Sequence, residues 1–279
     1  MVVILAALAP TASAQQAAVP EIPFDSVANF LKVPVDMNLG EASGVAVNSK
    51  GEIAVYTRSN SAGGPAYGAT ASQVLLFDKT GKFLREVGKG LYAWSYAHAI
   101  RFDKDDNLWA IDKGSDMVVK FNPEGHVTMV FGRKKEASDE AEPWTRVNPP
   151  RPPVPGQFRQ PTDVAWDAEG NIFVADGRGN ARIAKFTKDG VFVQSWGQKG
   201  NAPGQFADVD SIVVDARGNV YAADAGNGRI QVFGNDGTFQ REIVNVGNVQ
   251  AICITPGATQ VMFVSNSNPP NDLDKTGEI

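Results

Sequence analysis

The chain has 279 residues, of which 43% are hydrophobic, and it contains 28 glycines and 17 prolines. This apolar content is enough for a packed core, and the many turn-forming residues favour one β domain over a disordered chain. The net charge is −5, and no run of lysine or arginine lies beside aromatic residues on one strand. The composition therefore argues against nucleic acid as a main partner.

Residues 1–14 have the pattern of a signal peptide. An apolar stretch is followed by Ala12-Ser13-Ala14, the small-x-small pattern that signal peptidase accepts, although no basic residue precedes it. The alternative is a buried N-terminal strand, against which Pro10 and the many alanines argue. The stretch is too short to span a bilayer. We therefore expect an exported protein, periplasmic or extracellular, without a membrane span.

Three later segments repeat one another, starting at Asp106, Gly170 and Gly218. Each opens at a turn, runs through apolar residues to an Asp, turns again and continues as an alternating strand to another turn. This is the pattern of a β-hairpin. Gly170 and Gly218 are 48 residues apart, and a period of this length made of strands and turns predicts the blades of a β-propeller.

Weaker copies of the repeat start at Ser43 and at Gln250. Together they predict a propeller over residues 40–279 with four complete blades and part of a fifth. Residues 15–39 form an N-terminal segment that could supply a closing strand. An open ring would leave two apolar blade faces in water, so we expect the chain to be truncated at its C-terminus and less soluble than a longer version.

Residues 134–157 interrupt the repeats with charges and prolines. The stretch predicts a long surface loop of polyproline character. It is either a disordered insertion or a lid over one propeller face, in which case Trp144 and Arg146 could contact a ligand.

Equivalent positions of the repeats predict where a ligand could bind, because in a propeller they lie at one height around the central channel. The start of each inner strand carries a polar residue, and a convergent polar ring in a concavity is typical of a ligand site. This first ring comprises Ser43, His98, Thr162, Asp210 and Gln250. The end of each second strand gives another ring, Thr57, Asp112, Asp176, Asp224 and Ser265.

The aspartates of the second ring are interpreted as structural. Each precedes a turn, and its carboxylate can accept hydrogen bonds from the backbone N–H groups of that turn. Residues 103–107, DKDDN, resemble the start of a calcium loop but lack its glycine and distal glutamate, which favours a hairpin turn. The single cysteine, Cys253, lies in an apolar run and is predicted to be a buried core thiol.

Two phrases carry a resemblance to a known family: PGQFRQPTDVAWDAEGNIFVADGRGNARIAKF and PGQFADVDSIVVDARGNVYAADAGNGRIQVF. They are similar to NHL repeats, and over about residues 40–265 the chain resembles six-bladed propellers related to peptidyl-α-hydroxyglycine α-amidating lyase. The resemblance implies an all-β, NHL-type six-bladed fold, of which this chain would lack the last one to two blades.

The family's site holds a zinc bound by three histidines, with an arginine pair and a tyrosine for substrate. The resemblance places His98 at the first histidine position and Arg58 at the first arginine position. Asp210 stands at the second histidine position, Arg178 at the tyrosine position and Ala225 at the second arginine position. The sequence has two histidines, so a zinc held by three cannot form.

Two functions remain open. In the first, an exported propeller binds a small molecule, a peptide or a protein partner at its channel face, with contacts from Ser43, Tyr96, Thr162 and Gln250. In the second, a lyase-like enzyme uses Arg58 and Arg178 to hold a small anionic substrate. His98 and Asp210 could hold a divalent metal, zinc or calcium, together with water. The alternative is that His98 hydrogen-bonds within the aromatic loop of Tyr92, Trp94 and Tyr96, as plain polar lining or a ligand contact without a metal.

Overall fold

The computed structural model describes residues 25–37, 39–58, 72–135 and 152–267. The predicted signal peptide and the predicted lid residues Trp144 and Arg146 lie outside these ranges. Residues 1–30 and 31–279 form two compact units, and the fold below is that of the second. In the described part of the chain, no helix is long and apolar enough to cross a membrane.

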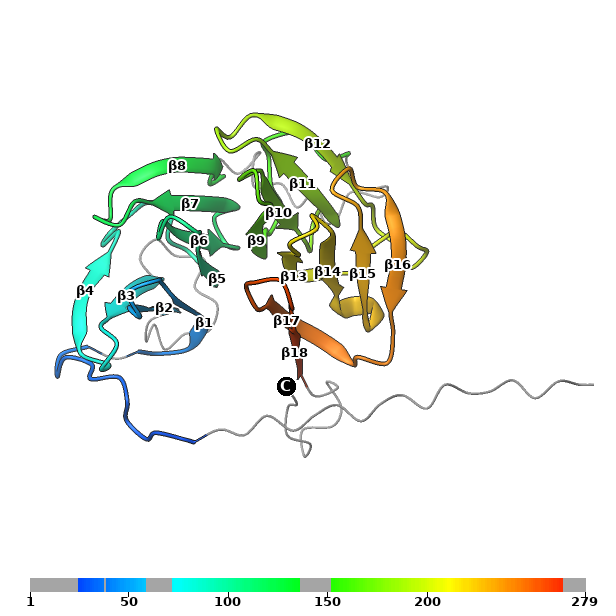
Figure 1. The fold of residues 1–279 in the computed structure, drawn as a ribbon. Helices are drawn as coiled ribbons and strands as arrows, with labels where there is room; N and C mark the ends of the chain where they lie inside the picture. The colour runs from blue at the N-terminus through cyan, green and yellow to red at the C-terminus, as the bar shows by residue number, and fades with distance from the viewer. Residues whose placement is uncertain (1–24, 38, 59–71, 136–151, 268–279) are drawn as a thin grey trace, which may run out of the picture. The chain divides into compact units, whose positions relative to one another are not determined.

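The second unit consists of antiparallel sheets that follow one another along the chain (Figure 1). Four sheets have four strands each, in sequence order, and a fifth has two. We number them as blades 1 to 5. Blade 1 comprises β1 (Ala42–Val47), β2 (Ile53–Thr57), β3 (Gln73–Phe77) and β4 (Phe83–Val87); blade 2 comprises β5 (Ala97–Phe102), β6 (Leu108–Asp112), β7 (Met117–Phe121) and β8 (Val127–Gly132). Blade 3 comprises β9 (Asp163–Trp166), β10 (Ile172–Asp176), β11 (Arg182–Phe186) and β12 (Phe192–Trp196). Blade 4 comprises β13 (Val209–Val214), β14 (Val220–Asp224), β15 (Arg229–Phe233) and β16 (Phe239–Ile243), with a 3-10 turn at Ala225–Asn227; blade 5 comprises β17 (Asn248–Ile254) and β18 (Met262–Ser267).

One turn chemistry recurs between the strands. In blade 3 the Asp167 carboxylate accepts the Asn171 N–H at 2.8 Å, and Gly170 takes a φ of 84° between them. Glycine adopts a positive φ without a steric cost, which explains why the repeat has glycine at this position of the turn. In blade 2 Asp106 holds this place with a φ of 58°, and Asp103 accepts the N–H of Asn107 at 3.0 Å. The predicted hairpin turn at residues 103–107 is confirmed.

Apolar side chains fill the space between successive blades. Trp94 and Phe121 of blade 2 pack with Tyr56 of blade 1 in one cluster. Similar clusters join blade 2 to blade 3, blade 3 to blade 4 and blade 4 to blade 5. The innermost strands β1, β5, β9, β13 and β17 contact one another in that order. A sheet that is apolar on both faces is therefore buried only between two neighbours.

The outward face of blade 1 is covered only in part. The side chains of Val45 and Val47 on β1 are 65% and 59% exposed. Farther out on the same blade, residues of the segment 31–39 pack on Val55, Leu75 and Phe77. In the described part of this segment, the only β pairing is an isolated bridge from Lys32 to Lys82.

The prediction for Cys253 is wrong, because the thiol is exposed. Its neighbour Ile252 is buried in the cluster shared with blade 4. Successive residues of a strand point to opposite faces, so Cys253 lies on the other face of blade 5.

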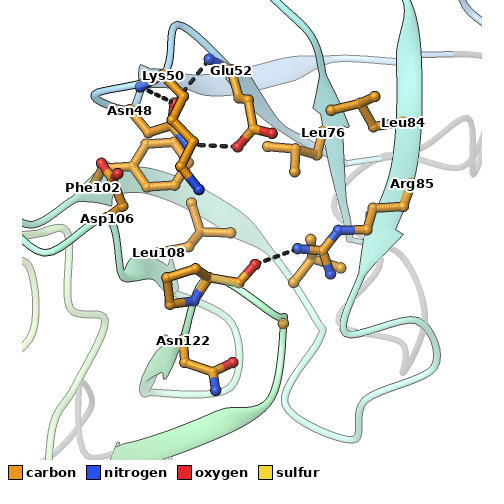
Figure 2. Close-up of a pocket in the computed structure, with 13 residues that line it drawn as sticks. Asn48, Lys50, Glu52, Leu76, Leu84, Arg85, Phe102, Asp106, Leu108 and Asn122 are labelled. Atoms are coloured by element: carbon orange, nitrogen blue, oxygen red, sulfur yellow. Dashed lines mark hydrogen bonds between the residues drawn. The ribbon is translucent and has the colours of Figure 1, made fainter.

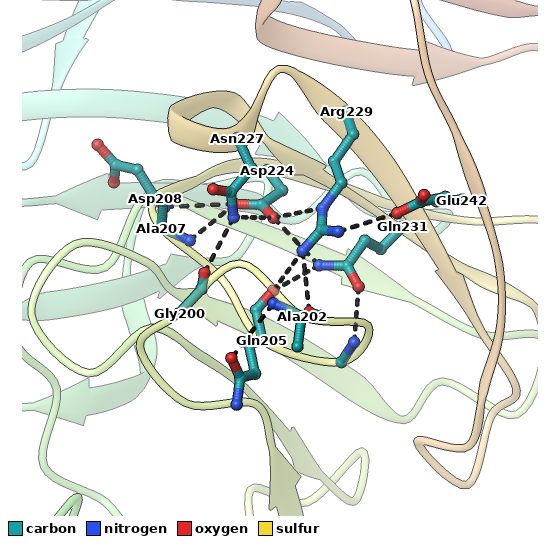
Figure 3. A network of polar contacts seen from close by, with 11 residues as sticks. Gly200, Ala202, Gln205, Ala207, Asp208, Asp224, Asn227, Arg229, Gln231 and Glu242 are labelled. Carbon is teal, nitrogen blue, oxygen red and sulfur yellow. Dashed lines mark hydrogen bonds and ion pairs between the residues drawn. The ribbon is translucent and has the colours of Figure 1, made fainter.

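The aspartates that end the second strands are structural, as predicted. Asp224 accepts hydrogen bonds from Ala207 N–H at 2.9 Å, from Asn227 at 2.8 Å and from Arg229 Nε at 3.0 Å. Figure 3 shows this network, in which Arg229 also donates to the carbonyl oxygen of Gln205 at 3.0 Å. The carboxylate and the guanidinium together tie the loop before β13 to the end of β14.

Candidate functional site

The first predicted ring lies at a repeated irregularity of the inner strands. The strand pairing shifts register at Ser43, His98, Asp210 and Gln250. Thr162 holds the same place just before β9, where its N–H donates to the Ala175 carbonyl at 2.8 Å. A bulge leaves one residue unpaired and redirects its side chain. The same register in each blade supports the expectation that these residues occupy one layer.

The second predicted ring needs a correction in blade 5. Thr57 pairs with Ala42, one residue before the bulge at Ser43. In blade 5, Asn266 pairs with Val249, the residue just before the bulge at Gln250. Ser265 pairs with Ala251, the residue just after the bulge. Asn266 is therefore the equivalent of Thr57, and the sequence alignment was off by one residue.

Three members of the first ring already bond to the protein itself. Thr162 is fully buried, and its hydroxyl donates to the Val209 carbonyl of the next blade at 2.6 Å. Ser43 donates to the Tyr56 carbonyl at 3.1 Å, and the Gln250 amide donates to the Asn248 side chain at 3.0 Å. The side chains of the other two ring members, His98 and Asp210, take no part in these three bonds.

His98 has a defined tautomer. Its Nδ1 lies 2.8 Å from the Thr162 carbonyl oxygen, which can only accept, so Nδ1 carries the proton and Nε2 is an unprotonated acceptor. Burial, followed by the positive charge of Lys113, lowers the pKa of His98 to about 4, and Arg178 adds to this effect. The imidazole is therefore neutral at physiological pH.

Asp210 is a buried carboxylate with an incomplete set of partners. Within the described residues neither of its oxygens accepts a hydrogen bond. Arg178 bridges the two neighbouring acids, with Nε 3.2 Å from Asp208 and a terminal nitrogen 3.5 Å from Asp210. Burial and the charge of Asp208 raise the pKa of Asp210 to about 6, against the opposing effects of Arg178 and Lys113.

Arg58 and Lys113 share one aromatic ring. The Arg58 guanidinium carbon lies 4.0 Å from the centroid of Tyr96, and the Lys113 ammonium nitrogen lies 5.8 Å from it. Arg58 also donates to the Ala97 carbonyl at 3.1 Å and pairs with Glu41 at 2.5 Å, where the Glu41 side chain is 68% exposed. Such a stack fixes the orientation of a guanidinium.

The sequence interpretation missed Lys113 as a site residue. It follows Asp112 just as Arg58 follows Thr57, so the repeat itself carried the signal. His98 and Asp210 belong to the same neighbourhood, because Lys113 and Arg178 change the pKa of both.

The residues present do not fit the zinc that the family resemblance implies. His126, the second histidine, lies in the turn between β7 and β8. Among the residues that the structure describes, no three His, Cys, Asp or Glu side chains gather into a possible metal site. Lys113 and Arg178 also place positive charge near His98 and Asp210. No reaction step is therefore assigned to a metal ion at this site.

Two cavities lie away from this cluster. Figure 2 shows one of about 110 Å³ between blades 1 and 2, lined by Leu76, Arg85 and Leu108 among others. Arg85 reaches across it to the Glu124 carbonyl at 2.7 Å. The second, of about 170 Å³, is lined by Arg133, Lys135, Gln157 and Phe158. Among the described residues that line these two cavities, none belongs to a site predicted from the sequence.

Residues 158–267 match a family model described as a six-bladed β-propeller. Over 263 residues the chain is 29% identical to peptidyl-glycine alpha-amidating monooxygenase B of Xenopus laevis, covering 84% of this chain and 28% of that protein. It is 28% identical over 177 residues to peptidyl-alpha-hydroxyglycine alpha-amidating lyase 1 of Drosophila melanogaster, covering 58% of this chain and 30% of the lyase. The chain is a β-propeller related to the amidating lyases. The two matches thus span under a third of each relative's length.

Other relatives share the fold without a common activity in their names. NHL repeat-containing protein 3 of Homo sapiens is 30% identical over 182 residues, covering 61% of this chain and 47% of that protein. A solved streptogramin B lyase superposes with a TM-score of 0.55 at 14% identity, over 78% of this chain and 60% of the lyase. The resemblance to NHL propellers is confirmed, while a match at this identity shows the fold alone.

Proposed function

We propose that the protein is an exported NHL-type propeller that binds a small anionic ligand at its channel face. The observation that carries this proposal is the grouping of three cations, Arg58, Lys113 and Arg178. Arg58 and Arg178 are each close enough to Lys113 to lower the pKa of its amine. They come from blades 1, 2 and 3, so the propeller itself brings them together.

Arg58 is the residue best prepared to hold a carboxylate. Its guanidinium is fixed against Tyr96, and its ion pair is with Glu41, an exposed residue. An ion pair in contact with water contributes little free energy, so an incoming carboxylate can replace Glu41 at small cost. Arginine also offers the two parallel donors that match a carboxylate.

The second candidate function is a lyase-like enzyme that acts on a small anionic substrate. The neutral His98 favours it, because an imidazole with Nδ1 bonded to a carbonyl and Nε2 unprotonated has the form of a general base. In this reading Arg58 and Arg178 hold the substrate and His98 removes a proton. A lyase reaction on an α-hydroxyglycine compound is the reaction type that the name of the Drosophila relative suggests.

Calorimetric titration tests the proposed ligand class. Acetate, lactate and pyruvate are titrated into the protein, with an uncharged alcohol of similar size as the control ligand. We expect the carboxylates to bind and Arg58→Gln to weaken them by about tenfold or more. Arg241→Gln, an exposed arginine on β16, serves as the matched variant and should change nothing. Equal binding by both variants would refute the proposal.

An α-hydroxyglycine-extended peptide separates binding from catalysis. If the second candidate is correct, the wild-type protein converts it and His98→Gln does not, while both still bind it. Elemental analysis after dialysis should find no stoichiometric metal, because Lys113 and Arg178 place positive charge near His98 and Asp210. Export is tested by the N-terminus of the mature protein, which should begin near Gln15.

A further inference from the structure

Among the residues that the structure describes, Lys113 is the cation of the site for which no ion pair with an acid is seen. The ion pairs of its neighbours join Arg58 to Glu41 and Arg178 to Asp208 and Asp210. Within the described residues none of the ion pairs includes Lys113. Its backbone N–H donates to the Tyr96 carbonyl at 2.9 Å, which fixes the main chain at the end of β6 beside the ring that Arg58 covers.

The surroundings of Lys113 lower the pKa of its amine. The residue is half-buried, and its burial is the main cause that lowers the pKa of the amine. Arg178 and Arg58 lower it further, while Asp210 and Asp208 act against them. A lysine that is desolvated beside other cations is the activated form of this side chain, because only the neutral amine has a free electron pair for attack on a carbonyl carbon.

We propose that Lys113 forms a reversible imine with an α-oxo acid whose carboxylate is held by Arg58. The inference rests on the proposed anion site and adds the chemical class of its ligand. An α-oxo acid carries its carbonyl next to its carboxylate, and Arg58 and Lys113 contact the same Tyr96 ring. The flexible four-carbon stem of Lys113 lets its amine approach the carbonyl of a ligand held by Arg58.

The step is balanced without an oxidant or a reductant. The amine nitrogen adds to the carbonyl carbon, and the electron pair of the C=O π bond moves to oxygen. A proton passes from nitrogen to that oxygen, and loss of water gives the C=N bond.

Reductive trapping tests the inference. Wild-type protein is incubated with pyruvate and sodium cyanoborohydride, and the labelled lysines are mapped by peptide mass spectrometry. We expect Lys113 to gain one carboxyethyl group at least about tenfold faster than Lys104, because a pyruvate whose carboxylate is held by Arg58 meets this amine at a high effective concentration. Lys104 is a suitable internal reference, since its side chain is 71% exposed.

Two controls connect the label to the site. Acetate has the carboxylate without the carbonyl, so excess acetate should slow labelling of Lys113 and leave Lys104 unchanged. Lys113→Arg should lose the rapid label, and Arg58→Gln should slow it. The acetate competition uses the wild-type protein, so the test does not depend on the folding of a variant.

The outcomes separate this inference from the proposed function. Rapid labelling of Lys113 that acetate suppresses supports both. If pyruvate binds by calorimetry but Lys113 is labelled no faster than Lys104, the imine is refuted and the anion site stands. If no carboxylate binds and Lys113 is not labelled, both are refuted.

Discussion

The Nδ1 atom of His98 lies 2.8 Å from the carbonyl oxygen of Thr162, so the inner end of blade 2 is bonded to that of blade 3. The Thr162 hydroxyl continues the connection by donating to the Val209 carbonyl of blade 4 at 2.6 Å. The layer that sequence equivalence predicted is thus partly a structural belt that joins three blades. The unprotonated Nε2 of His98 is the part of this belt that is available for chemistry.

His98 should make folding stability depend on pH. Its pKa falls from an ordinary value of 6.5 to about 4 in the folded protein. The unfolded chain therefore binds more protons between these values, and stability is full above the higher value and is lost as pH falls toward the lower one. His98→Gln should remove this loss, which amounts to roughly 2 kcal/mol between about pH 7.5 and pH 5.

Urea unfolding of the wild type and the variant across this range measures the effect as a difference. The other titrating groups are common to both proteins and cancel. His126→Gln changes a turn residue and should follow the wild-type curve. Parallel curves for the wild type and His98→Gln would contradict the prediction.

Asp210 should have the opposite dependence. Its folded pKa is raised from 3.8 to about 6, so the folded state binds more protons between these values. The carboxylate therefore costs stability above about pH 6, and this cost disappears as pH falls toward the lower value. Asp210→Asn should stabilise the protein by about 1–3 kcal/mol near neutral pH, with a smaller difference in acid.

Thermal unfolding at two pH values measures this effect. Asp189→Asn, in the exposed turn between β11 and β12, is the matched control and should be neutral at both. A variant that is less stable than the wild type at neutral pH would show that the Arg178 ion pair outweighs the cost of burial.

The blades could be predicted from the sequence because their determinants are local. A hairpin needs a positive φ at its turn, and the repeat supplies glycine at Gly170 and Gly218 for that reason. The alternation of side chains then fixes which face of each strand is apolar. The polar ring was predictable as well, because equivalent residues of equivalent strands share one height.

The missed features depend on contacts between distant segments. Cys253 lies in an apolar run, but the thiol would be buried only if another blade packed against its face of blade 5. The slip between Ser265 and Asn266 arose because a bulge shifts strand pairing without a change of residue type. The role of Lys113 depends on Arg178, which pairs with Asp208 and Asp210, so that within the described residues no ion pair involves the lysine.

Asp112 should be essential for the stability of blade 2. Its carboxylate accepts the N–H groups of Ser95 at 2.8 Å, Tyr96 at 2.9 Å and Ser115 at 2.9 Å. All of these partners donate, so the amide nitrogen of an asparagine would face another donor. Asp112→Asn should lower the free energy of unfolding by about 2–4 kcal/mol.

Denaturant unfolding measures this loss, and Asp105→Asn provides the control, because Asp105 is exposed and pairs only with Lys104 on the surface. Since Asp112 also positions Tyr96, the variant should weaken carboxylate binding at Arg58. An unchanged midpoint would mean that the buried carboxylate is not the anchor of this turn.

Gly177 occupies the place in blade 3 that Arg58 and Lys113 hold in blades 1 and 2, and it should tolerate no side chain. An added Cβ would lie 2.0 Å from the Val209 carbonyl oxygen and 2.8 Å from the Thr162 hydroxyl. These two atoms are hydrogen-bonded to each other, so a methyl group would push apart the contact that joins blade 3 to blade 4. Gly177→Ala should cost about 2–4 kcal/mol of stability.

Gly234→Ala is the matched control, because its Cβ would meet the carboxylate end of Asp236 at 2.7 Å, and that side chain can rotate away. Thermal unfolding should separate the two variants by several degrees. Gly177 also precedes Arg178, so Gly177→Ala should weaken carboxylate binding while Gly234→Ala leaves it unchanged. Equal stability of the two variants would show that β13 can move away from blade 3 without loss, and the belt through Thr162 would then not hold the inner strands together.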